Sequence, residues 1–380
     1  MTQDPLGDIP LFREIQKILS SSEGPINLEI ARQVANALNQ DSTDHIDPDS
    51  AQRFAQTVAT AGFVVAGYTR LTPDEPARAE LVSRRDWVAR TLTAWQWLLT
   101  HLAARFASEI GSFSEERGAE VDPMGAVMGQ VAPLLMGMQA GTLVGQVAHD
   151  ATGRYDPPIP REDDGHLFQV AANVEAIAEG YSVPPDHLSA WLAVGDVVRH
   201  SVSEAIPWVS RYRRSLFIEV VDSLEIDPSD LERRLEELQT RGPEALQEGL
   251  GPTQMIPVVP TERHQAALRR LHAFTSVFDG YARHVLGRVS EELIGNIGQI
   301  EEAMRRRDAT PGEGTAMLNS LLGISFDPAL AQSGTTFAAA VVELKGINQL
   351  NRVWDAPDNL PSIDEIRDPF AWMERVLVDE

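Results

Sequence analysis

The chain of 380 residues has no cysteine, which excludes a disulfide framework and every kind of thiol chemistry. Lysine is almost absent as well, because Lys17 and Lys345 are the two lysines among 32 basic residues. The 56 acidic residues give a formal net charge of −24, which argues against nucleic acid as a partner. Residues 1–20 lack the basic start and the uninterrupted apolar run of a secretory signal. We therefore expect a soluble, cytoplasmic protein.

Lysine, arginine, aspartate and glutamate are all missing between Asp122 and Asp150, a stretch long enough to span a bilayer. Glycines recur there at every fourth or eighth position, a spacing that lets membrane helices approach closely. One interpretation is therefore membrane association through Met124–Ala148. The glutamines and the proline inside the run, and the lack of aromatic residues at its ends, favour a buried helix of a helical domain. We expect the buried helix.

Hydrophobic residues recur with helical periodicity along most of the chain, and one short segment has the composition of a strand. The predicted helices are Pro10–Leu19, Asn27–Leu38, Pro48–Ala66, Trp87–Ala107, Asp186–Ser203, Val209–Leu224, Asp230–Arg241, Glu262–Leu286, Glu291–Arg307, Phe326–Gly346 and Pro361–Val378. Leu167–Ala171 is the strand candidate. Gly242–Pro260, rich in glycine and proline, is the predicted linker or mobile loop. The fold class is mainly α with one small β element.

The helix around Ala190–His200 has the frame of a zinc-protease helix without its ligands. In the motif H-E-x-x-H, two histidines lie one turn apart on one face of a helix, and the glutamate between them is the general base. Here Gly195 and Arg199 stand at the histidine positions, and Asp196 stands at the glutamate position. Glycine has no side chain to coordinate a metal, and a guanidinium cannot lose a proton to become a ligand. These residues predict the helix but no zinc site on it.

The sequence around this helix resembles a family of zincin-like metallopeptidases, which are described as hydrolases and come mostly from actinobacteria. The family pattern is W-x-A-L-H-E-x-x-H with P-W after a short spacer, and here Trp191 precedes the motif and Pro207-Trp208 follow it. The segments Gly24–Ala35, Leu134–Gly141 and Leu350–Pro361 are also similar to the family. The resemblance covers most of the chain and implies a zincin-like helical domain. We expect residues 1–110 to form an N-terminal helical region and 111–380 a zincin-like region, unless both form one continuous domain.

The resemblance also implies a third zinc ligand, a glutamate on a later helix in the pattern L-L-E-G-H/Y-A-x-x-V. The matching run is Val277–Val285, which places Asp279 at this position on the helix 262–286. Aspartate can bind zinc, but its side chain is one methylene shorter. In zincins a strand beside the site commonly orders the substrate backbone, and Leu167–Ala171 precedes the motif helix here. All four positions that carry the family's chemistry therefore differ from the family pattern.

Two hypotheses about function follow from these differences. In the first, the chain is a pseudoenzyme without a cofactor, which has a binding or structural role toward an unknown protein or peptide. Arg199 then replaces the missing metal ion and forms an ion pair with Asp279, Asp196 or both, since buried carboxylates need a counter-charge. The family resemblance implies the second, an active hydrolase, which here would need a rearranged zinc site of Asp196, His200 and Asp279. Asp196 and His200 share a helix face, but His200 lies about 100° around the helix from Arg199, the position of the family's second histidine ligand. We therefore expect the pseudoenzyme.

Overall fold

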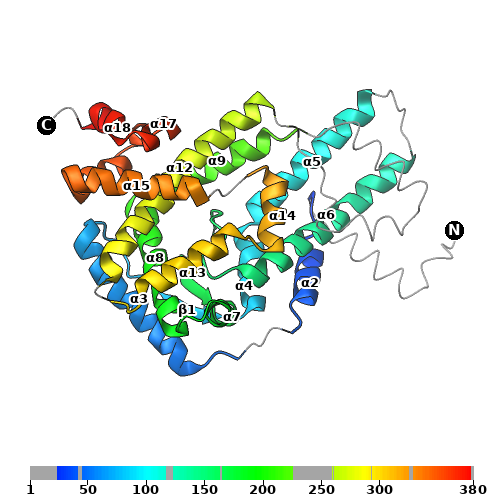
Figure 1. The fold of residues 1–380 in the computed structure, drawn as a ribbon. Coiled ribbons are helices and arrows are strands. Elements are labelled where there is room, and N and C mark those ends of the chain that lie inside the picture. Colours follow the sequence, from blue (N-terminus) through cyan, green and yellow to red (C-terminus); the bar gives the residue numbers. More distant parts are fainter. Residues whose placement is uncertain are drawn as a thin grey trace.

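The computed structural model describes residues 24–41, 45–116, 123–162, 165–225, 259, 261–291, 293–324 and 328–377. Their elements are α2 (Leu28–Leu38), α3 (Pro48–Thr69), β1 (Ala79–Val82), α4 (Arg84–Ala94), α5 (Gln96–Glu116), α6 (Pro123–Asp150), β2 (Leu167–Val170), α7 (Ala171–Gly180), α8 (Pro185–Ala205), α9 (Val209–Asp222), α12 (Glu262–Ser290), α13 (Ile297–Ala309), α14 (Glu313–Leu322), α15 (Pro328–Lys345), α16 (Ile347–Leu350), the 3-10 helices η2 (Asn351–Trp354) and η3 (Pro357–Asn359), α17 (Ile363–Arg367) and α18 (Pro369–Val376). The predicted fold class, mainly α with a small β element, is confirmed (Figure 1). The predicted segments Pro10–Leu19 and Asp230–Arg241, and nearly all of Gly242–Pro260, lie outside the described residues.

Several helices begin at polar residues whose side chains satisfy the first free backbone N–H groups. The Asn27 side chain accepts a hydrogen bond from the Ile30 backbone at the start of α2, and Asp47 accepts one from Ser50 at the start of α3. Thr261 does the same at the start of α12. Because such caps are visible in the sequence, the starts of these helices agree with the prediction within one residue.

The predicted single helix Trp87–Ala107 is wrong, because the structure divides this region into α4 and α5 at Trp95. The hydrophobic periodicity continues through the break, so the local sequence contains no stop signal. The Trp95 ring lies fully buried against Trp87 in an edge-on arrangement, with ring centroids 5.9 Å apart. The contact between these two rings therefore accompanies a break that periodicity alone did not reveal.

Two other helix boundaries differ from the prediction for local reasons. The predicted helix Pro361–Val378 is two helices, α17 and α18, because Pro369 lacks a backbone N–H and begins a new helix. Helix α13 starts at Ile297 and not at Glu291, since Asn296 adopts a left-handed conformation with a φ of 58°.

The glycine spacing of α6 serves close packing against α2. A Cβ atom on Gly137 would lie 2.4 Å from the Asn27 carbonyl oxygen, and one on Gly141 would lie 2.5 Å from that of Ala31. The two helix backbones therefore approach to a distance that side chains would prevent. In the part of the chain that the structure describes, no helix has the length and hydrophobicity needed to cross a membrane.

Helices α8 and α12 lie in the interior of the molecule, and α12 packs against α15, α8 and α9 (Figure 1). α12 and α15 cross at Gly280 and Gly334, where a Cβ atom on Gly334 would lie 1.8 Å from the Ser276 carbonyl oxygen. One cluster of buried hydrophobic side chains extends from Ile26 to Met373 and includes residues on both sides of position 110. The division into regions 1–110 and 111–380 stays a prediction.

β2 is the predicted strand, and it pairs in parallel with β1, with Ala79 opposite Leu167. The sequence analysis missed β1, because four residues of mixed polarity give no clear alternation. The opposite edge of β2 is occupied by the segment after α6. The Val170 N–H donates to the Thr152 carbonyl at 2.9 Å, and the Arg154 N–H donates to the Phe168 carbonyl at 3.2 Å.

Candidate functional site

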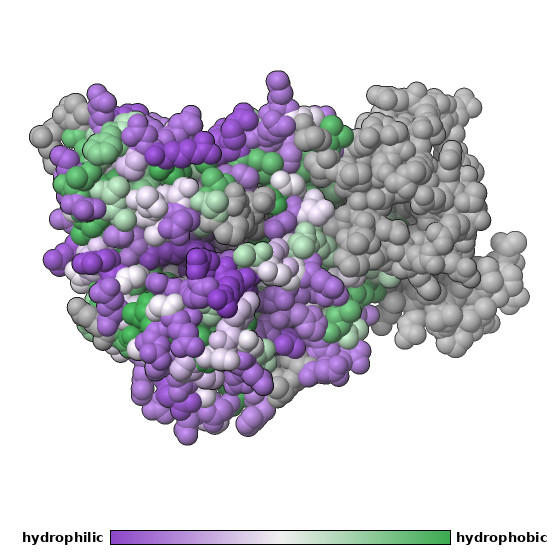
Figure 2. Space-filling view, in the orientation of Figure 1, coloured by the Kyte–Doolittle hydropathy of each residue, from purple (hydrophilic) through white to green (hydrophobic). Residues whose placement is uncertain are grey.

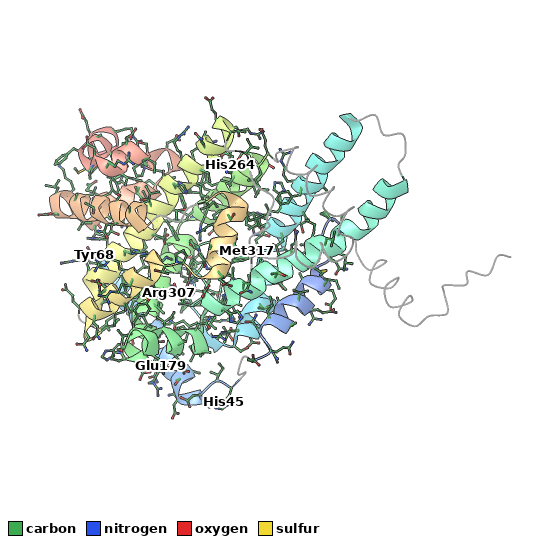
Figure 3. The ribbon with its side chains drawn as sticks, turned by 45° about the vertical axis from the view of Figure 1, so that its right-hand side comes forward. His45, Tyr68, Glu179, His264, Arg307 and Met317 are labelled. Carbon is green, nitrogen blue, oxygen red and sulfur yellow. The ribbon has the colours of Figure 1, made fainter. Side chains whose placement is uncertain are left out.

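A cleft of about 520 Å³ lies between α8, α12, α13, α14 and the segment after α6. Gly195, Asp196, Arg199 and Asp279, the four positions that the sequence analysis selected, all line it. Arg307, another residue of the cleft, lies near the middle of the molecule in Figure 3, on α13. The face seen in Figure 2 is mostly hydrophilic, with hydrophobic residues in small groups.

Arg199 of α8 forms an ion pair with Asp279 of α12 across this cleft. Its Nε donates a hydrogen bond to Asp279 Oδ1 at 2.9 Å, and its Nη1 lies 3.6 Å from Asp196 Oδ1. The three side chains are 14–19% exposed, so the pair lies in a largely desolvated wall of the cleft. The predicted ion pair of Arg199 with Asp279, Asp196 or both is confirmed, and both carboxylates lie within ion-pair distance.

Gly195 leaves space for the guanidinium of Arg199. Long side chains in helices point back toward the preceding turn, so Arg199 lies over the residue four positions earlier. A Cβ atom on Gly195 would lie 3.2 Å from Arg199 Nη1 and 3.6 Å from Leu286 Cδ2. A histidine side chain at position 195 would collide with the guanidinium. The two replaced histidine positions are therefore physically coupled.

Burial and charge act in opposite directions on the ionisable groups of this site. Burial raises the pKa of Asp196 to about 7, although the neighbouring Arg199 acts to lower it. Burial acts to lower the pKa of Arg199, but the carboxylates of Asp279 and Asp196 outweigh it, and the pKa is raised. Arg199 therefore remains a cation, while Asp196 can bind a proton near neutral pH.

His200 does not join Asp196 and Asp279 at the cleft. Its side chain is buried, does not line the cleft, and lies near Gly165, where a Cβ atom would be 3.9 Å from its Cε1. Burial lowers the pKa of His200 to about 4, so its ring is neutral. The alternative ligand set of Asp196, His200 and Asp279 is not assembled as a metal-binding group.

A second ion pair in the cleft was missed by the sequence analysis. Arg307 Nη2 donates to Asp156 Oδ2 at 2.7 Å, and the Thr152 hydroxyl donates to the same oxygen at 2.8 Å. Burial acts to raise the pKa of Asp156, but Arg307 and Thr152 lower it overall. The proline-rich loop after α6 was the available signal, since its Asp156 precedes two prolines. Arg307 lies 151 residues further along the chain, and no local sequence pattern reveals a contact over such a separation.

Two further groups complete the electrostatics of the site. Arg283 donates to Asp308 at 2.8 Å farther along the cleft. Arg213 lies behind the cleft wall, almost fully buried, where it donates to the Pro158 carbonyl at 2.6 Å and lies over the Phe278 ring. Burial lowers the pKa of Arg213 to about 10, so it too remains a cation at neutral pH.

The residues at the family's ligand positions do not fit a zinc ion. Gly195 supplies no donor atom, and the guanidinium of Arg199 is already hydrogen-bonded to Asp279, the carboxylate that would be the third ligand. Over the described ranges, no three His, Asp or Glu side chains form a group that could hold a metal. The donor chemistry here therefore opposes the metal that the motif frame implies.

β2 does not serve the cleft as the substrate-ordering strand expected from the resemblance. None of its residues lines the cleft. Both of its edges are occupied, one by β1 and the other by Thr152–Arg154. An extended peptide therefore finds no free backbone edge on β2.

Comparison with known proteins extends the resemblance seen in the sequence. The family model described as zincin-like metallopeptidase matches residues 26–373. A solved structure from Chloroflexus aurantiacus, described as a "putative hydrolase with a novel fold", has the same fold with a TM-score of 0.65. It is 24% identical in sequence, and the match covers 93% of this chain and 99% of that one. No curated protein matches the chain.

Proposed function

Because the chain belongs to the zincin-like metallopeptidase family, we propose that it is a member in which an arginine has taken the place of the metal, and that its role is binding without catalysis. The observation that carries this proposal is the hydrogen bond of 2.9 Å between Arg199 and Asp279. A zinc site holds buried carboxylates against a divalent cation. Here a permanent monovalent cation, covalently part of α8, meets the same carboxylate.

Loss of the metal removes the chemistry by which zincins hydrolyse peptides. A zinc ion polarises the scissile carbonyl and lowers the pKa of its bound water to about 7. A guanidinium can polarise an oxygen atom by hydrogen bonding, but it has no empty coordination position for water. Asp196, at the position of the general base, lies 3.6 Å from this guanidinium. The occupied edges of β2 also support a role without peptidase activity.

The cleft itself supports a binding role. Its volume of about 520 Å³ is that of a pocket for a small molecule or a peptide end. Its lining combines ion-paired charges with apolar side chains such as Trp191, Leu192 and Leu286. This combination allows an apolar ligand with one or two polar groups to be oriented.

Metal analysis of the purified protein tests the proposal. After incubation with zinc and gel filtration, we expect far less than one zinc per chain, and we expect no change in the thermal unfolding midpoint on addition of a chelator. Stoichiometric zinc that is lost on substitution of Asp196, His200 or Asp279 would instead establish the hydrolase alternative. A variant of an exposed histidine, such as His45→Ala, controls for adventitious zinc on the surface.

A further inference from the structure

The guanidinium of Arg199 has more donors than the protein uses. Arginine carries five N–H groups, and Nε uses one of them on Asp279. Among the described residues, the four N–H groups on Nη1 and Nη2 make no hydrogen bond, and Nη1 lies 3.6 Å from Asp196 Oδ1. Arg199 lines the cleft and is 19% exposed, so a bound molecule can reach these groups.

The charge around Arg199 favours an additional anion. Asp279 interacts electrostatically with two guanidiniums, because it lies close to the buried Arg213 as well as to Arg199. Within the described part of the chain, Arg213 forms no ion pair of its own. The other nearby carboxyl, Asp196, has a pKa of about 7 and is partly protonated near neutral pH. Two arginines, Arg199 and Arg213, therefore share the carboxylate of Asp279, and Asp196 beside them titrates near neutral pH.

We infer that the cleft binds a carboxylate ligand with an apolar body, and that Arg199 holds the carboxylate through its Nη atoms. A carboxylate is planar and carries two acceptor oxygens, which match the parallel N–H groups of a guanidinium. Trp191 and Leu286 provide apolar wall for the body of the ligand. The Trp191 Nε1–H is buried without a hydrogen-bond partner and offers one more donor. The inference rests on the proposed function, since it requires that no metal occupies this end of the cleft.

The rest of the cleft selects against a doubly charged anion. Three aspartates line its other part, Asp150, Asp156 and Asp308, against the two arginines Arg283 and Arg307. Arg307 is paired with Asp156, and Arg283 is paired with Asp308. Burial raises the pKa of Asp150, which is the remaining carboxyl. The raised pKa shows that this part of the cleft disfavours negative charge, and it should disfavour a phosphate dianion more than a monoanionic carboxylate.

Carboxylate binding is expected to take up a proton at Asp196. The charged and titratable groups around this residue are Arg199 on its own helix, Asp279 on α12, and Arg154, Tyr155 and Asp156 from the segment after α6. A ligand anion on Arg199 adds negative charge beside Asp196 and favours its protonated form. The affinity should therefore increase as the pH falls from 8 to 6, by up to about tenfold per pH unit.

Isothermal titration calorimetry with N-acetylphenylalanine and its uncharged amide tests this inference on the full chain. We expect the acid to bind at least tenfold more tightly than the amide at pH 6.5. Phenyl phosphate should bind more weakly than the acid. At pH 7.5, where Asp196 is mostly ionised before binding, the measured heat should depend on the ionisation enthalpy of the buffer, which reports proton uptake.

Variants of two arginines then locate the carboxylate. R199K keeps a cation beside Asp279 but removes the paired N–H groups, so we expect a loss of affinity of at least tenfold. R306Q removes an exposed cation of α13 that does not line the cleft and is the control, with a change of less than about threefold expected. Circular dichroism confirms that each variant is folded.

Equal affinities for acid and amide, undiminished affinity in R199K, or no binding of the acid at millimolar concentration would each overturn the inference. None of these results would affect the metal analysis, because that test does not depend on the ligand. Conversely, stoichiometric zinc would overturn the proposed function directly, whichever ligand binds.

Discussion

Replacement of Arg199 by methionine provides the sharpest test of the idea that an arginine compensates the carboxylates of this cleft. Methionine keeps an unbranched apolar side chain but removes the charge. Asp279 then remains 14% exposed in the folded protein without its hydrogen-bonded partner. Removal of one member of a buried pair costs about 3–5 kcal/mol. We expect about 3 kcal/mol at pH 8, since the cleft wall is partly hydrated and Arg213 remains near Asp279.

Urea unfolding, followed by circular dichroism at pH 8 and pH 5.5, measures this free energy. The loss should be smaller at pH 5.5, because Asp196, whose pKa burial raises to about 7, then carries a proton and adds no second uncompensated charge. R199M/D279N should recover much of the stability at pH 8, because it removes the carboxylate that is left without its partner. R283M is the control, because Arg283 and Asp308 are 35% and 27% exposed, and we expect a loss of less than about 1 kcal/mol. Wild-type stability of R199M at pH 8 would refute the reasoning.

The remaining predictions concern helix packing, pH dependence and the metal-ligand positions of the family. In the same urea assay, G334A should lower the free energy of unfolding by about 3 kcal/mol or more, because its Cβ atom would lie 1.8 Å from a backbone oxygen of α12. G287A on α12 is the control, since a Cβ atom there has open space and the substitution should be neutral or stabilising by up to about 1 kcal/mol. The pKa of Asp196 is raised by burial to about 7, so its ionised form costs stability above pH 7 and none below about pH 4. D196N should therefore be more stable than wild type by about 2 kcal/mol at pH 8 and equal to it at pH 4, and equal pH profiles of the two proteins would disprove this. G195H/R199H removes the guanidinium and places two imidazoles beside Asp279 of α12, so this variant should bind zinc stoichiometrically in equilibrium dialysis. If it binds no zinc, α8 and α12 do not have the spacing of a zincin metal site.

Much of the helical framework was predictable because its signals are local. Caps such as Asp47 and Thr261 act on neighbouring backbone groups. The break at Trp95 was not predictable, because the hydrophobic periodicity continues through it without a local stop signal. β1 was missed for a related reason, since its partner lies about 90 residues later and its own four residues carry a weak pattern.

The sequence by itself determined that the family's two histidine ligands are missing from this helix. Glycine has no donor atom and arginine keeps its proton in every environment, so Gly195 and Arg199 exclude the family's two histidine ligands wherever the helix lies. The family resemblance also pointed to Asp279 as the third position. These conclusions depend on residue type and on spacing within one helix, which the chain specifies locally.

Only the tertiary structure decided which charges meet and how strongly they interact. Arg199 and Asp279 are 80 residues apart, and Arg307 and Asp156 are 151 residues apart, so their pairing depends on how α8, α12 and α13 pack. Packing also removed Asp196 from water, which raised its pKa, and turned His200 away from the cleft. Burial and distance set the energy of a charge, and both are properties of the folded chain.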